Sequence, residues 1–85
     1  MIAKILYNKE TESQNLAESF AKSLEELKVP NELIDADTRD GAALAELYDL
    51  LSRPSVVLLR DDGSVIERWQ HALPLATDIS YLAHQ

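Results

Sequence analysis

Cysteine is absent from this sequence of 85 residues. Without a thiol, the chain alone cannot form a disulfide, hold a metal through thiolates or cycle a dithiol between its oxidised and reduced forms. Glycine is also scarce, with two residues, whereas 46% of the residues are hydrophobic. This composition is typical of an ordered globular protein, and the length predicts a single domain over residues 1–85.

Long apolar runs and positive charge are also lacking. No run approaches the ~20 residues that a membrane-spanning helix needs, and Met1 leads directly into a short strand pattern instead of a signal peptide. Eight Lys and Arg residues stand against 15 Asp and Glu, a formal net charge of -7, which repels phosphate backbones and anionic membranes. We therefore expect a cytoplasmic protein that binds neither nucleic acid nor a membrane; its oligomeric state stays open.

The clearest structural signal is an apolar run, Val56 to Leu59, that follows Pro54 closely. Proline cannot donate to a β ladder and is favoured at the first residue of a strand, so this run predicts a strand buried on both faces. Apolar residues in segment 1–7 predict a central, mostly buried strand. Segments 32–35 and 65–69 predict two more strands.

Segment 65–69 follows the turn sequence Asp61-Asp62-Gly63. Two strands joined by an Asp-Gly turn form an antiparallel hairpin, so this segment is expected to pair with Val56 to Leu59 at an edge of the sheet. Trp69 in it is open to two interpretations. It is either an exposed anchor for a partner or a side chain packed on the sheet.

Three further segments show helical spacing. In the first, Thr11 and Gln14 match a capping box, and the residues expected on its buried stripe are Leu16, Ala17, Phe20, Ala21, Leu24 and Leu27. The second, capped by Thr38 or Asp40, is expected to run through Ala43, Leu44, Leu47, Tyr48 and Leu51. The third covers residues 75–82. The order is βαβ, then α, then ββα, which predicts an α/β protein whose four-stranded mixed sheet is flanked by three helices.

This order, with proline at the entrance to the third strand, resembles the thioredoxin-like fold over essentially the whole chain. The opening Ile5-Leu6-Tyr7-Asn8-Lys9-Glu10-Thr11 is similar to glutaredoxin, in which a Cys-Pro-Tyr-Cys motif follows. Glu12, Ser13, Gln14 and Asn15 occupy those four positions here. The second half, with Ser52-Arg53-Pro54-Ser55, Asp62-Gly63 and Glu67-Arg68-Trp69, is more similar to thioredoxin.

The resemblance implies a cis Arg53–Pro54 bond and a glycine after the fourth strand, where this chain has Gln70-His71-Ala72. Loss of that glycine is expected to crowd the groove for glutathione or a peptide. The resemblance also implies that one edge of the fold gathers the positions of the family's active site. The candidate binding residues at this former active-site edge are Glu12, Ser13, Gln14, Asn15, Arg53, Pro54 and His71.

Two interpretations of this set are open. Arg53 either binds an anionic ligand or a partner's carboxylate, helped by the free N–H groups at the helix N-terminus, or forms only a surface ion pair with Glu12. A triad of Ser13, His71 and Glu12 is not supported, because the sequence has no nucleophile elbow or glycine-rich oxyanion loop. We therefore assign no catalytic residue.

Metal sites and cofactors are not predicted either. His71 and His84 lack a spacing that would place both on one helical face with a carboxylate. The cluster Asp35, Asp37 and Asp40 lacks the sixth-position glycine and the terminal glutamate of an EF-hand, so it is interpreted as a solvated loop with helix caps.

Three functions are compatible with these observations. The preferred hypothesis is a non-catalytic module that binds another protein through the former active-site edge or through the hairpin edge. The second is a site for glutathione or another small anion at the first helix N-terminus, with or without an activity that uses no thiol. The third is a chain that works only as half of a homodimer, or a redox-associated protein that acts with a cysteine-bearing partner.

Overall fold

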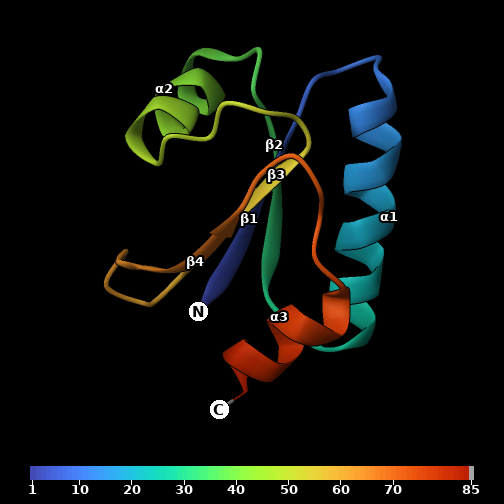
Figure 1. Cartoon of the computed structure of the whole chain (residues 1–85), viewed down its shortest axis with the longest axis vertical. Coiled ribbons are helices and arrows are strands. Elements are labelled where there is room, and N and C mark those ends of the chain that lie inside the picture. The colour runs from blue at the N-terminus through green and yellow to red at the C-terminus, as the bar shows by residue number, and fades with distance from the viewer. Residues whose placement is uncertain (85) are drawn as a thin grey trace.

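The computed structural model describes residues 1–84 (Figure 1). Within these residues the elements are β1 (Ile2–Tyr7), α1 (Glu12–Glu26), β2 (Asn31–Asp35), α2 (Arg39–Leu47), β3 (Ser55–Leu59), β4 (Val65–Trp69) and α3 (Ala76–Ala83). The predicted order of βαβ, α and ββα is confirmed, and each predicted strand and helix is present. No helix among these residues combines the length and apolar character that crossing a bilayer requires.

The strands form one mixed sheet in the order β2-β1-β3-β4. β1 pairs in parallel with β2 and antiparallel with β3, which in turn pairs antiparallel with β4. Every residue of β3 is buried, as the apolar run after Pro54 predicts, because helices cover both faces of the sheet at this strand. β4 lies at an edge, and a β-bulge at Leu58 and Leu59 interrupts its pairing.

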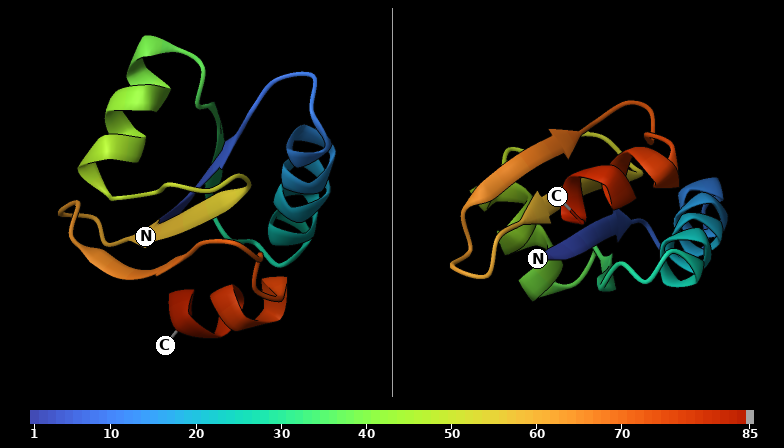
Figure 2. Two further views of the ribbon diagram at one scale, coloured as in Figure 1. Left: turned by 45° about the horizontal axis from the view of Figure 1, so that its top comes forward. Right: turned by 90° about the horizontal axis from the view of Figure 1, so that it is seen from below.

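The two faces of the sheet carry separate apolar cores. On one face, Ile5, Val56 and Leu58 pack with α1 and α3, and the half-buried Trp69 packs against this cluster. On the other face, Leu6, Val57 and Leu59 pack with α2. The views agree with this division, because α1 and α3 lie together on one side of the strands and α2 lies on the other (Figures 1 and 2).

The buried face of α1 differs from the predicted stripe. Ala17, Phe20, Ala21 and Leu24 are buried as expected, but Leu16 is 46% exposed. Ser13 is buried in the position that continues the stripe toward the N-terminus. The helix is therefore rotated relative to the prediction, so that its buried face includes the small residues Ser13, Ala17 and Ala21.

Both α1 and α2 end in a Schellman motif without glycine. In α1, Lys28 has a φ of 60°, its N–H donates to Glu25 O, and Val29 N–H donates to Leu24 O. In α2, Asp49 has a φ of 57° and Leu50 N–H donates to Ala45 O at 2.8 Å. Each motif returns an apolar residue, Val29 or Leu50, to the core, which is the contact expected of this type of helix end.

The second helix is shorter than the sequence predicts, because it ends in the Schellman motif. The sequence predicts that Leu47 and Leu51 continue its buried stripe, but α2 ends at Leu47 and the chain then turns back. Leu50, not Leu51, enters the core, and Leu47 and Leu51 are 74% and 84% exposed. Helical spacing in the sequence therefore extended past the real end of the helix.

The predicted helix caps have two outcomes. Thr38 is the N-cap of α2, and its hydroxyl accepts a hydrogen bond from Gly41 N at 3.0 Å. The capping box at Thr11 is wrong, since the Thr11 hydroxyl donates to Asn8 O at 2.6 Å and makes no cap bond. Gln14 does reach back, but its Oε1 accepts from Glu10 N, one residue before the predicted donor.

Candidate functional site

The topology of the sheet brings several loops to one end of the molecule. The parallel strands β1 and β2 finish there, with Tyr7 opposite Asp35. β3 runs antiparallel to β1 and therefore begins there, with Ser55 opposite Leu6. β4 finishes there, because Trp69 pairs with Val56. We call this end, with the loops 8–11, 36–38, 51–54 and 70–72, the Pro54 end; it is uppermost in Figure 1.

The loop before β3 and the loop after β4 are joined at the Pro54 end by hydrogen bonds. Leu51 N donates to Gln70 Oε1 at 2.8 Å, and His71 N donates to Ser52 Oγ at 2.7 Å. The Arg53–Pro54 peptide bond between these contacts and β3 is cis, and Pro54 is buried. The two hydrogen bonds fix the relative positions of the loop before β3 and the loop after β4.

Arg53 is turned back onto its own loop. Its Nη1 donates to Leu50 O at 2.7 Å and to Ser52 O at 2.9 Å, and the side chain is half-buried. The expected surface ion pair with Glu12 is not formed: the salt bridge found among residues 1–84 joins Met1 and Asp61. The Nη1 group of the guanidinium is therefore used to hold the loop, and Nε is buried without a hydrogen-bond partner among these residues, which leaves less of the guanidinium for an anion.

The Ser13 hydroxyl is used in the turn that precedes α1. It accepts from Asn8 N at 2.9 Å and forms a hydrogen bond with the Thr11 hydroxyl. Ser13 is only 8% exposed. A nucleophile needs a general base within hydrogen-bond reach, and the partners of this hydroxyl are Asn8 and Thr11. The geometry gives Ser13 a structural role.

The remaining candidates at the start of α1 are polar and accessible to different degrees. Glu12 and Asn15 are exposed, and Gln14 is half-buried with its Nε2 donating to Glu18 Oε1 at 2.9 Å. The neighbouring Glu10 is exposed as well. Carboxylates at Glu10 and Glu12 oppose the approach of a second anion to the helix N-terminus, although that terminus by itself favours negative charge.

His71 occupies an unusual backbone conformation. Its φ is 69°, and Ala72 N donates to Gln70 O at 2.8 Å across it. A hydrogen bond between residues i and i+2 with positive φ at the central residue describes a γ-turn, a strained form. His71 thus stands where the resemblance implies a glycine, and its exposed side chain projects from the Pro54 end.

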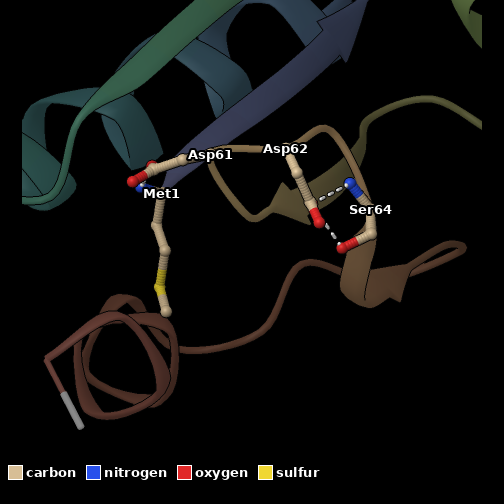
Figure 3. A network of polar contacts seen from close by, with 4 residues as sticks. All are labelled: Met1, Asp61, Asp62 and Ser64. Atoms are coloured by element: carbon tan, nitrogen blue, oxygen red, sulfur yellow. Dashed lines mark hydrogen bonds and ion pairs between the residues drawn. The ribbon is translucent and has the colours of Figure 1, made fainter.

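The opposite end of the sheet holds a second polar group, the turn between β3 and β4 (Figure 3). The Met1 amine contacts Asp61 there. Asp62 accepts from Ser64 Oγ at 2.7 Å and Ser64 N at 2.9 Å. These bonds, helped by Arg60, hold the pKa of the exposed Asp62 carboxyl below its usual 3.8. The contacts close the turn and join it to the start of β1.

A shallow hollow of about 450 Å³ also lies at that opposite end. The residues that line it are Ile2, Glu25, Lys28, Val29, Pro30 and Asn31. Among residues 1–84, no cluster of at least three His, Asp or Glu side chains is arranged to hold a metal ion. Asp35 and Asp37, which the calcium interpretation grouped, instead accept hydrogen bonds from Asp37 N and from Asn8 Nδ2.

Contacts that organise the Pro54 end include residues that the sequence did not single out. Ser52 and Gln70 supply the side-chain atoms that join the two loops, and Asn8 anchors the turn before α1. These are common polar residues in loops. Their pairing depends on the fold, and no local pattern in the sequence indicates it.

Solved structures with the same fold identify the architecture. No protein-family model and no curated protein sequence matches the chain. Thioredoxin 1 of Thermosipho africanus is 12% identical and aligns with a TM-score of 0.71 over 95% of this chain and 88% of its own. Thioredoxin-2 of a malaria parasite, described as a component of its protein secretion machinery, is 18% identical, with a TM-score of 0.75 over 95% and 78% of the two chains.

A further malarial protein is 18% identical and has a TM-score of 0.73 over 95% of this chain and 90% of its own. The chain therefore has the thioredoxin-like fold, as its sequence predicted, and it has this fold without cysteine.

Proposed function

We propose that the chain is a binding module that recognises another protein through the Pro54 end. The observation that carries the proposal is the pair of hydrogen bonds that join Leu51 to Gln70 and Ser52 to His71, next to a Leu51 side chain that is 84% exposed. Because the loop is already ordered, a partner that contacts Leu51 does not have to order it on binding, which lowers the entropic cost of association.

The polar groups at this end support binding over chemistry. Ser13 bonds to the adjacent turn, Arg53 bonds to its own loop, and the chain has no thiol for thiol–disulfide exchange. Glu10 and Glu12 at the start of α1 oppose glutathione and other small anions. A protein of this fold can serve in an assembly, since the parasite thioredoxin-2 is described as a component of secretion machinery.

Site-specific photocrosslinking in the native cells tests the proposal. A photoreactive phenylalanine analogue replaces Glu12 or Ala72 at the Pro54 end, and Glu25 or Tyr81 as controls; all four are exposed. We expect a discrete product with a second polypeptide from positions 12 and 72 that the control positions do not give. Equal products from all four positions, or none from 12 and 72, would contradict the proposal.

A titration of the labelled protein with glutathione and with inorganic phosphate addresses the small-anion alternative. We expect no saturable change in the amide shifts of residues 12–15, 53 and 70–72. Saturable shifts confined to these residues would replace protein binding with anion binding as the function of this end. A cross-linked partner that carries a reactive cysteine would place the chain in a redox assembly.

A further inference from the structure

β2 forms an open edge of the sheet, because the strand order is β2-β1-β3-β4. The pairing of the other edge strand, β4, is interrupted by the β-bulge at Leu58 and Leu59. β2 instead pairs with β1 in one continuous register over its five residues, and it contains no proline, lysine or arginine. Bulges, prolines and lysines are common devices that keep an edge strand from pairing with another chain. β2 therefore keeps a regular backbone that can accept another strand.

The backbone groups of β2 alternate between β1 and the open side. Ala3 N donates to Pro30 O at 2.9 Å just before the strand, and Ala36 N donates to Tyr7 O at 2.8 Å just after it. Because positions 30 and 36 both bond to β1, the residues of β2 that point to the open side are Asn31, Leu33 and Asp35. Leu33, the central one, is 39% exposed. Its N–H and C=O are directed at the position that a further strand would take.

A second copy of β2 fits this edge when it runs antiparallel, with a two-fold axis at Leu33. Every residue of the strand is then paired: Leu33 with Leu33, Asn31 with Asp35, and Glu32 with Ile34. The open-side residues lie opposite one another, which is the arrangement that exchanges backbone hydrogen bonds. No carboxylate lies directly opposite another carboxylate, so the strand is complementary to itself in this register.

Other antiparallel registers are less favourable. A shift of two residues in one direction places Glu32 opposite Glu32, and like charges directly opposite destabilise a strand pair. A shift of two in the other direction places Leu33 opposite Asp35 and leaves Asn31 beyond the end of the second strand. A shift of one residue brings open-side residues opposite residues whose backbone bonds to β1. The register centred on Leu33 is therefore the one that the strand selects.

The outer pairs of this register can also bond through their side chains. Asn31 Nδ2 donates to Val29 O at 3.0 Å, and an amide nitrogen has a second hydrogen to donate. Asp35 Oδ1 accepts from Asp37 N at 2.9 Å, and a carboxylate has a second oxygen to accept. An Asn31–Asp35 hydrogen bond at each end of the paired strands would join the two copies.

The partner is selected here by backbone and register, not by charge. Both signs occur around β2, since Lys4 and Lys28 lie near Glu32 and Asp35 in the sheet or the preceding turn. Two chains with a formal charge of -7 each repel one another, and salt screens this repulsion. Association of two copies should therefore strengthen as salt rises, whereas a contact between opposite charges would weaken.

We infer that two copies of the chain pair antiparallel through β2, with Leu33 at the two-fold axis, and join their sheets into one. The contact is small beside stable interfaces, which bury ~1,200–2,000 Å², so the dimer is reversible. The inference goes beyond the proposed function and does not rest on it. Because the axis reverses one copy, the two Pro54 ends lie at opposite ends of the joined sheet, which makes the dimer bivalent.

Sedimentation equilibrium of the chain tests for the dimer. Samples at concentrations up to about 1 mM are compared in ~0.05 and ~0.5 M sodium chloride. We expect the mass to rise from 9.5 kDa toward twice that value as the concentration increases, and to rise further in the higher salt. A mass of 9.5 kDa under every condition, or association that weakens in the higher salt, would overturn the inference.

Single cysteines test the register, because the wild type has none. The two Leu33 Cα atoms would lie ~5.5 Å apart, a separation that a disulfide spans, so Leu33→Cys should give a disulfide-linked dimer when oxidised with diamide. Glu32→Cys should not, since residue 32 faces residue 34 of the second copy. Val65→Cys is the control on β4, with 38% exposure against 39% for Leu33. Equal dimer from all three variants, or dimer from Glu32→Cys alone, would exclude this register.

Glutamate at the same two edge positions provides a matched pair without cross-linking. Leu33→Glu places two carboxylates opposite each other at the axis and should weaken association about tenfold or more. Val65→Glu adds the same charge to β4 and should change association less than about twofold. Equal effects would show that β2 is not the contact. An unchanged amide spectrum away from the substituted strand verifies that each variant folds.

The glutamate variant also separates this inference from the proposed function. Photocrosslinks to a different polypeptide from positions 12 and 72 should persist in Leu33→Glu, because this substitution lies outside the Pro54 end. A product between two copies has twice the mass of the chain and counts toward the dimer only. If the wild type gives no product from positions 12 and 72 but still forms the dimer, the proposed function fails and the pairing through β2 stands.

Discussion

His71 has a positive φ and is the central residue of a γ-turn. Glycine would adopt this backbone conformation more easily than histidine does. An L-residue in the left-handed region carries a cost of roughly 1–2 kcal/mol, which glycine avoids. We predict that His71→Gly raises the free energy of unfolding by about 0.5–1 kcal/mol, after allowance for the greater entropy of glycine in the unfolded chain. Urea denaturation at pH 7 measures this change.

Ala72 provides the matched control, because it is the next residue, is exposed and does not have a positive φ. Ala72→Gly should lower the free energy of unfolding by about 0.5–1 kcal/mol, since it adds only freedom to the unfolded chain. If both glycine variants lowered it equally, the conformation assigned to His71 would be incorrect.

We predict that the Asp62 carboxyl makes the stability of the folded chain depend on pH. Its bonds to Ser64 lower the pKa of the folded carboxyl below 3.8. A lowered folded pKa gives stability that is present above the unfolded value and is lost as pH falls through the folded pKa. Asp62→Asn should therefore lower the midpoint of urea unfolding at pH 7. The difference between the midpoints of the variant and the wild type should shrink below pH 3.8.

Ser64→Ala gives an independent check on that carboxyl, because it removes the largest cause of the shift. In this variant the Asp62 carboxyl, followed by NMR, should titrate closer to 3.8 than in the wild type. An identical titration in both proteins would mean that the Ser64 hydroxyl does not lower the pKa of the Asp62 carboxyl.

Single residues differ in how far the sequence predicts their roles. Pro54 could be placed, because the apolar run after it defines the start of a strand. The bonds of Ser52 and Gln70 could not, because each partner lies 19 residues away in the chain. Arg53 could be assigned to the Pro54 end but not to its carbonyl partners, because a long flexible side chain chooses among neighbours that only the folded loop supplies.

At the scale of elements, the glycine-free ends of α1 and α2 offer a direct test of their geometry. Lys28 takes the left-handed position in the Schellman motif of α1, a position that glycine usually fills. We predict that Lys28→Gly raises the free energy of unfolding by about 0.5–1 kcal/mol. Chemical denaturation, read by the circular dichroism of the helices, measures it.

Lys22, which is exposed in the middle of α1, serves as the control for the same chemical change. Lys22→Gly should destabilise by roughly 0.5–1 kcal/mol, since glycine is unfavourable within a helix. Opposite signs for the two variants would support the assigned end of α1. A loss of stability in both would contradict it.

Gly41 fixes the approach of α2 to the end of β2. A Cβ at this position would lie 2.0 Å from the backbone oxygen of Asp35 and 3.0 Å from the Cα of Ala36. We predict that Gly41→Ala lowers the free energy of unfolding by about 1–3 kcal/mol or more, because the backbone must move to make room.

Gly63→Ala is the comparison for that effect in thermal or urea unfolding. A Cβ at Gly63 meets nothing within 4 Å, so only its positive φ of 88° opposes alanine. If Gly41→Ala cost no more than Gly63→Ala, the close packing of α2 on the β2–α2 loop would be disproved.

The sequence predicts which elements are present better than it predicts where they end or which face they bury. The strand after Pro54 is clear because apolar residues are continuous, and α1 is clear because its helical spacing extends over several turns. The end of α2 was missed, since Leu51 fits the helical period and nothing marks Asp49 as a left-handed residue. The rotation of α1 was missed because Ser13, a polar residue, takes a buried position.

At the scale of the whole molecule, the chain combines the thioredoxin-like fold with a sequence that contains no cysteine. Strand directions bring the loops of the Pro54 end together, as the resemblance of the sequence to the thioredoxin-like fold implied. The exposed leucines beside that end could not be predicted, because their exposure depends on a turn three residues long. The function proposed here rests on those features of the folded chain.

An amide footprint of the complex tests the central claim most directly. The labelled chain is titrated with the purified polypeptide that cross-links from positions 12 and 72, and the shift of each backbone amide is followed. We predict saturable changes at residues 51–53 and 70–72, where the joined loops lie. Changes confined to the opposite end, residues 28–31 and 60–64, with the Pro54 end unaltered, would contradict the account.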